Sequence, residues 1–155
     1  MTAREAEIIE LIRKEVKPAL GCTEPIAVAL AVAKAMEIIE DNCALAPHWR
    51  MQDGFTLRIE VSGNILKNGM GVGIPGTGMV GLHIAAALGA VCGRSEYGLE
   101  VLNDLDETSI ERAKQLVLDK SVTVGLAETD HKLYVKAIIE CKDGHTAYTV
   151  IEDNH

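Results

Sequence analysis

An uncharged stretch of 25 residues, from Gly69 to Gly93, constrains the fold of this chain more than any other feature. A membrane span needs roughly 20 continuous apolar helical residues, so the stretch is long enough to raise that question. Five glycines and one proline interrupt its first ten residues, however, and only residues 79–92 can continue as a helix. The stretch therefore predicts a glycine-rich loop that leads into a buried core helix.

Two further helices are expected before this stretch. A capping box at Thr2 and Glu5, followed by apolar residues at helical spacing, predicts a helix up to about residue 16. Thr23 is a suitable N-cap for a second helix. That helix is apolar on all sides from Ile26 to Ala33, and we expect it to lie centrally in the domain.

Strand patterns occupy the middle and the last third of the chain. Residues 55–61 alternate between apolar and polar types, as a half-buried strand does. Residues 121–126 form a short candidate strand, and residues 131–140 and 145–151 are expected to pair as a hairpin around a two-residue turn, Asp143–Gly144.

The order of these elements indicates the fold class. A third capping signal, Thr108 with Glu111, starts a helix between the strands. The order differs from the regular strand–helix alternation of a doubly wound sheet. We expect an α+β fold in which apolar helices pack on a mixed or antiparallel sheet of about four strands with a C-terminal hairpin. We also expect one domain, residues 1–155, that is the N-terminal fragment of a longer enzyme.

Charge and cysteine content exclude several classes of protein. The chain has 15 Lys+Arg against 23 Asp+Glu, a formal net charge of −8, and only 3% aromatic residues. Nucleic acids and anionic membranes are therefore not expected as partners. The first residues are charged throughout, and the four cysteines form no CxxC pair. This pattern predicts a cytoplasmic protein with reduced thiols and no metal site of its own.

Cys22 is the first candidate for chemistry. It directly precedes the expected start of the second helix, where backbone N–H groups stabilise negative charge and lower a thiol pKa. Such a thiolate can act as a base or nucleophile. The alternative is that Cys22 is a small apolar residue packed at a helix start. Glu24 in the same motif is more simply explained as a charge that complements the helix dipole.

The loop from Ser62 to Gly78 is the second candidate. It is expected to run from a strand to a helix start, so its amides can form an anion-binding nest. Its side chains add further donors, and Lys67 is the cation among them. Residues 71–76 match GxGxxG formally, but they lie too far beyond the strand for a dinucleotide-binding turn. A carboxylate or phosphate is the expected ligand.

Three motifs make the chain resemble a known family. They are ALGCTEPIAVALA (19–31), VSGNILKNGMGVGIPGTGMVGLHIAAALGA (61–90) and GLEVL (98–102). The chain is similar in them to the N-terminal part of the L-cysteine desulfidase family, which is related to the alpha chain of iron–sulfur L-serine dehydratases. Members are cytoplasmic, longer than this chain and bind a [4Fe–4S] cluster. They eliminate sulfide from L-cysteine and yield pyruvate and ammonia.

The resemblance implies roles for individual residues. Cys22 matches the family's proposed catalytic base, which takes the Cα proton. The cluster ligands of the family lie in its C-terminal portion, so this chain is expected to bind no cluster and to be inactive alone. The substrate is expected to be held by a set of residues from both motifs: Thr23, Ser62, Gly63, Asn64, Lys67, Asn68, Gly76, Thr77 and Gly78.

Other functions stay open at this stage. Cysteine and serine carry the same carboxylate and amine, so an L-serine dehydratase-like deaminase is an alternative. A non-catalytic module that binds or senses an amino acid is a second alternative, and a dimerisation domain is a third. The expected partners are a small amino acid, the C-terminal part of the same protein and a second copy of the chain.

Overall fold

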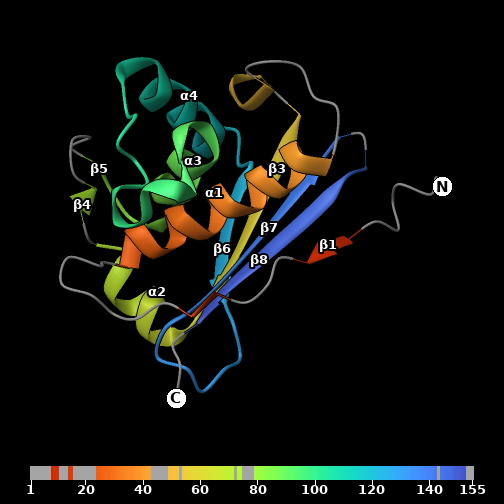
Figure 1. The fold of residues 1–155 in the computed structure, drawn as a ribbon. Helices are drawn as coiled ribbons and strands as arrows, with labels where there is room; N and C mark the ends of the chain where they lie inside the picture. The colour runs from red at the N-terminus through yellow and green to blue at the C-terminus, as the bar shows by residue number, and fades with distance from the viewer. Residues whose placement is uncertain are drawn as a thin grey trace.

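The computed structural model describes residues 8–10, 14–15, 24–42, 49–52, 54–71, 73–74, 79–142 and 144–152. Within these residues, four α-helices pack beside a large mixed sheet in an α+β arrangement, as expected (Figure 1). The helices are α1 (Glu24–Asn42), α2 (Gly63–Gly69), α3 (Leu82–Cys92) and α4 (Glu107–Leu118). Short 3-10 turns lie at Trp49–Met51 (η2) and Ser95–Glu100 (η3).

Four longer strands form the body of the sheet, in the order β8-β7-β3-β6. They are β3 (Phe55–Val61), β6 (Val122–Leu126), β7 (Tyr134–Cys141) and β8 (Thr146–Glu152). β3 runs parallel to β6 and antiparallel to β7, and β7 pairs with β8 as the predicted hairpin. At the hairpin turn the Cys141 amide donates to the His145 carbonyl at 2.8 Å, so three residues, 142–144, connect the strands and the expected two-residue turn is wrong. Asp143 lies outside the described residues.

The core lies between one face of the sheet and the helices. α1 crosses this face diagonally, and α3 packs beside it (Figure 1). The two helices approach closely because Gly89 has no side chain: a Cβ built there would lie 2.5 Å from the Ala29 carbonyl oxygen. Thr149 of β8 ties the sheet to α1 by donating a hydrogen bond to the Ala31 carbonyl at 2.6 Å. The apolar run that predicts a central helix is thus confirmed.

Several predicted boundaries are wrong. The loop expected over residues 62–78 contains helix α2, because Ser62 caps it and Ile65 is buried beneath it. α3 begins at Leu82 rather than at residue 79, and Met79 pairs with Ile74 in a short two-stranded sheet of β4 (Gly73–Ile74) and β5 (Met79–Val80).

The helix expected up to residue 16 is also wrong where residues are described. Ile8–Glu10 (β1) and Lys14–Glu15 (β2) pair parallel with β8 instead. The backbone groups along the outer edge of β8 provide hydrogen-bond partners that a sequence pattern does not reveal. Thr2 and Glu5 lie outside the described residues.

The cap of α4 is corrected as well. Asp106 is its N-cap, accepting a hydrogen bond from the Ser109 amide at 2.8 Å, so that the helix begins before Thr108. Aspartate competes well with threonine for this position because its carboxylate also complements the helix dipole. Within the described residues, no helix is both long and apolar enough to cross a membrane.

Candidate functional site

The first turn of α1, the end of α2 and the start of α3 meet at one end of the helical layer (Figure 1). Gly69 is the point of contact. A Cβ built on Gly69 would lie 3.1 Å from Cβ of Glu24 and 2.6 Å from Cδ2 of Leu82. Glycine is required here because any side chain would separate α2 from its two neighbours.

The turn into α3 lies against the same end of α2. Gly81 precedes α3 with a φ of +104°, a conformation that favours glycine, and a Cβ there would lie 3.1 Å from the Met70 carbonyl oxygen. The two long motifs of the sequence, which are separated by about 30 residues of chain, are therefore in van der Waals contact.

The electrostatic consequence follows from helix direction. α1 and α3 both direct their N-terminal ends toward this junction, and they have 19 and 11 residues. The free N–H groups of two N-terminal turns favour negative charge nearby. Lys67 lies in the last turn of α2, where a cation complements the C-terminal end of its own helix.

Not all predicted site residues can be placed. Cys22, Thr23, Gly76, Thr77 and Gly78 lie outside the described residues. Cys22 and Thr23 directly precede Glu24, the first residue of α1, and residues 76–78 lie between β4 and β5 in the sequence. Their assignment to the site stays a prediction.

The described members of the predicted set divide into two groups. Ser62 is buried, donates its hydroxyl hydrogen to the Lys132 carbonyl at 2.8 Å and accepts from the Ile65 amide at 3.4 Å. Its hydroxyl group therefore holds α2 in place. The other group is exposed: Gly63, Asn64, Lys67 and Asn68.

The exposed group lies on the side of α2 that faces away from Gly69, and Asn68 donates to Asn64 at 3.2 Å. Gly69 is buried against α1 and α3, whereas these four residues are exposed, so the body of α2 lies between them and the contact with α1. Sequence spacing predicted that all of them line one loop, and that arrangement is not what α2 provides.

A hollow that the sequence did not reveal lies away from this junction, at the opposite ends of α1 and α3. It has a volume of about 830 Å³ and is lined by α1, η2, η3, the end of α3 and the start of α4. Arg50 organises its wall: the guanidinium group makes a two-pronged ion pair with Glu40, at 2.8 and 2.9 Å, and donates to the Gly93 carbonyl at 2.8 Å. Glu37 accepts from both the amide and the hydroxyl of Ser95.

The pKa values of several side chains that line this hollow are shifted, and Glu40 and Cys92 show opposite outcomes of burial. Burial would raise the pKa of Glu40, but hydrogen bonds and charge from Arg50, with a further hydrogen bond from Trp49, hold it below its usual value. Burial raises the pKa of the Cys92 thiol to about 11, so that this thiol is protonated at neutral pH. No local pattern around Arg50 signals its pairing with α1, because Glu40 lies 10 residues away.

The chain is similar to proteins named UPF0597 protein. It is 49% identical to the one of Phocaeicola vulgatus over 96% of this chain and 32% of that protein. It is 50% identical to the one of Parabacteroides distasonis, over 88% of this chain and 29% of that protein. It is 47% identical to the one of Shewanella pealeana, over 95% of this chain and 32% of that protein. The chain thus spans about a third of the length of these relatives. No family model matches it, and no solved structure does.

Proposed function

We propose that this chain is the N-terminal, base-carrying part of a lyase that eliminates sulfide from L-cysteine. The single observation that carries the proposal is the contact of Glu24 and Leu82 at Gly69. It brings the helix start that follows Cys22 next to the segment expected to hold a substrate carboxylate. The resemblance of both motifs to L-cysteine desulfidases supplies the substrate.

The reaction assigns two proton transfers to Cys22. The Cys22 thiolate takes the Cα proton of L-cysteine, the electron pair of that bond forms the Cα–Cβ double bond, and the Cβ–S bond breaks to release HS⁻. The proton on Cys22 then passes to the sulfide. The remaining aminoacrylate tautomerises to an imine, which water hydrolyses to pyruvate and ammonia. Cys22 takes no part in these last two steps.

The base requires a lowered thiol pKa, and the fold supports this requirement. An ordinary cysteine has a pKa of about 8.5, whereas cysteines at helix N-termini fall to about 3.5–7.5. Cys22 lies two residues before the first residue of α1, and the start of α3 points to the same junction. L-serine, which has the same carboxylate and amine, is the competing substrate.

Binding of an iron–sulfur cluster is not assigned to this chain. Among the described residues, no three His, Cys, Asp or Glu side chains are grouped so that they could hold a metal ion. Cys92 and Cys141, the cysteines that the structure describes, are both half-buried, and Cys92 donates to the Leu88 carbonyl at 3.4 Å. The chain's own part in the chemistry is therefore the base and the carboxylate-binding segment.

The decisive experiment measures the pKa of Cys22. The purified chain is treated with iodoacetamide over a range of pH, and the alkylation of each cysteine is followed by peptide mass spectrometry. We expect the pH of half-maximal alkylation of Cys22 to lie below about 7.5. Cys92 provides an internal control, because its alkylation should become extensive only near its pKa of about 11.

The outcomes separate the candidate functions. A Cys22 midpoint at or above about 8.5 contradicts the proposal, since the thiol would be an ordinary one. If such an inert thiol is found and calorimetry shows that the chain binds L-cysteine or L-serine, the chain is a binding module instead. Sulfide release from L-cysteine is expected with the longer relatives and absent with this chain alone; turnover by the chain alone would contradict the proposed division of labour.

A further inference from the structure

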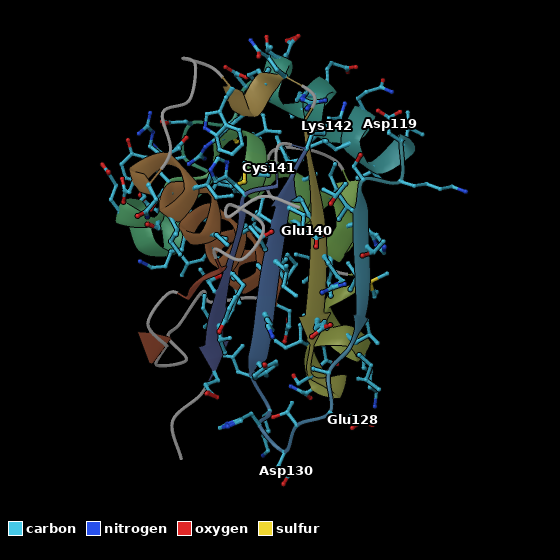
Figure 2. The ribbon with its side chains drawn as sticks, turned by 90° about the vertical axis from the view of Figure 1, so that its right-hand side faces the viewer. Asp119, Glu128, Asp130, Glu140, Cys141 and Lys142 are labelled. Carbon is cyan, nitrogen blue, oxygen red and sulfur yellow. The ribbon has the colours of Figure 1, made fainter. Side chains whose placement is uncertain are left out.

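We propose that two copies of this chain pair along strand β6, antiparallel, around a two-fold axis through Val124. β6 is the last strand of the sheet, hydrogen-bonded only to β3 among the described strands. Figure 2 shows it at one side of the sheet, with Asp119 near its beginning and Glu128 beyond its end. The two lateral edges differ, because β1 and β2 pair with β8 at the other side.

The backbone groups of β6 are arranged for such pairing. The Ser121 carbonyl accepts from Leu57 at 2.8 Å, and the Ala127 amide donates to Val61 at 2.7 Å, so the odd-numbered residues face β3. Backbone direction alternates along a strand, and the even-numbered residues Val122, Val124 and Leu126 therefore direct their N–H and C=O groups outward. In an antiparallel pair each facing couple of such residues exchanges two hydrogen bonds.

The strand lacks the usual protection of a sheet edge. Natural edges are blunted by charged residues, proline or bulges, because open edges pair with other chains. The sequence of β6, Val-Thr-Val-Gly-Leu, contains neither charge nor proline. An edge of this kind is the signature of a strand that is covered in the assembled protein.

The exposed apolar side chains match a two-fold axis. Leu118 and Leu126 are the most exposed large apolar residues described, at 74% and 63%, and they lie near opposite ends of β6. With the axis at Val124, Leu126 of one copy faces Val122 of the other. Leu118 lies four residues before Val122. The exposed Leu118 of one copy is therefore brought near the exposed Leu126 of the other copy.

The charges select a second copy as the partner. Lys120 lies four residues before Val124 and Glu128 four residues after it, and both are exposed. Neither makes an ion pair within the described part of the chain. Lys120 lies in the turn just before β6, with a φ of +60°, and Glu128 lies just beyond the end of β6. In the proposed pair each Lys120 comes to the end of the interface where the other copy presents Glu128, so opposite charges flank the paired strands at both ends. A self-complementary pattern of this kind defines an isologous interface.

Analytical ultracentrifugation of the chain from micromolar to near-millimolar concentration tests the proposal. We expect a monomer–dimer equilibrium that weakens on the order of tenfold with either Lys120→Glu or Glu128→Lys, since each places like charges at both ends of the interface. The double variant Lys120→Glu/Glu128→Lys restores opposite charges and should return the dissociation constant to within about threefold of the original. Lys132→Glu, another exposed lysine, serves as the charge control.

A backbone variant tests the strand pairing itself. Val124→Pro removes an outward-facing N–H that makes no bond within the sheet, and it should abolish the dimer while circular dichroism shows a folded monomer. A chain that stays monomeric at the highest concentration overturns the proposal. So does a dimer that neither single charge variant weakens, or whose weakening the double variant fails to reverse; these readouts remain decisive if Val124→Pro does not fold.

Discussion

Replacement of Gly69 by alanine tests the junction on which the proposed function depends. The added methyl group would lie 2.6 Å from Cδ2 and 3.2 Å from Cγ of Leu82, and 3.1 Å from Cβ of Glu24. Leu82 is fully buried, so its side chain cannot move into solvent. Either the core around Leu82 must shift or the end of α2 must move away from α1.

Two opposing free-energy changes determine the magnitude. Overpacking of a well-packed site costs about 1–3 kcal/mol. Alanine recovers roughly 0.5–1 kcal/mol of backbone entropy relative to glycine in a helix, and less at the last residue, which Gly69 is. The net destabilisation of Gly69→Ala should be about 1–2 kcal/mol. For a chain of this size that corresponds to a decrease in Tm of about 2–8 °C.

Thermal and urea unfolding of four variants make the test specific: Gly69→Ala, Gly71→Ala, Leu82→Ala and Gly69→Ala/Leu82→Ala. Gly71→Ala is the matched control, because a Cβ at Gly71 has no atom within 4 Å, and its stability should change by less than about 0.5 kcal/mol. In a double-mutant cycle with Leu82→Ala, the cost of Gly69→Ala should largely disappear. Equal Tm values for Gly69→Ala and Gly71→Ala would refute the close packing of α2 against α1 and α3.

The remaining predictions concern the core and the hollow beside Arg50. Arg50→Ala should destabilise the fold by about 1–3 kcal/mol, because its side chain is only 13% exposed and donates three hydrogen bonds, two to Glu40 and one to the Gly93 carbonyl. Arg94→Ala removes a side chain that is 59% exposed and paired once, and it should cost at most about 1 kcal/mol; urea denaturation compares the two variants. Thr149→Val keeps the shape but removes the buried donor to Ala31, and calorimetry should show a loss of about 1 kcal/mol or more that Thr149→Ser does not share. The raised pKa of Cys92 makes the free energy of unfolding depend on pH. The stabilisation by the protonated thiol is complete below the usual pKa of 9.0 and is lost as pH rises toward about 11, so stability should fall over that interval. Cys92→Ala should flatten this measured pH dependence.

Residue patterns were sufficient where one physical requirement governs a segment. The alternation in residues 55–61 could only bury one face of a strand, and β3 has that burial pattern over Phe55–Val61. The apolar run in residues 26–33 could only be stable inside the protein, and α1 buries it between α3 and the sheet. The hairpin of β7 and β8 likewise follows from the sequence, because two strand-like runs lie close together on either side of Asp143–Gly144.

Patterns failed where a distant part of the chain decides. Six glycines between residues 63 and 78 looked like a loop, yet the Lys132 carbonyl fixes Ser62 and a pocket for Ile65 allows a helix to form. The same applies to Arg50, whose partners Glu40 and Gly93 lie 10 and 43 residues away. No local spacing records such contacts.

The sequence by itself determined which segments are buried, because burial depends on local apolar periodicity and on the solvation cost of charge. It also marked Cys22 and the 62–78 segment as the polar features in an otherwise apolar frame. Only the tertiary structure decided that Glu24, Gly69 and Leu82 come into contact, and that Lys67 and Asn64 face away from them. Such contacts depend on how closely two backbones can approach. That distance is short where a glycine has no side chain, and the residue that packs against the glycine comes from a distant part of the sequence.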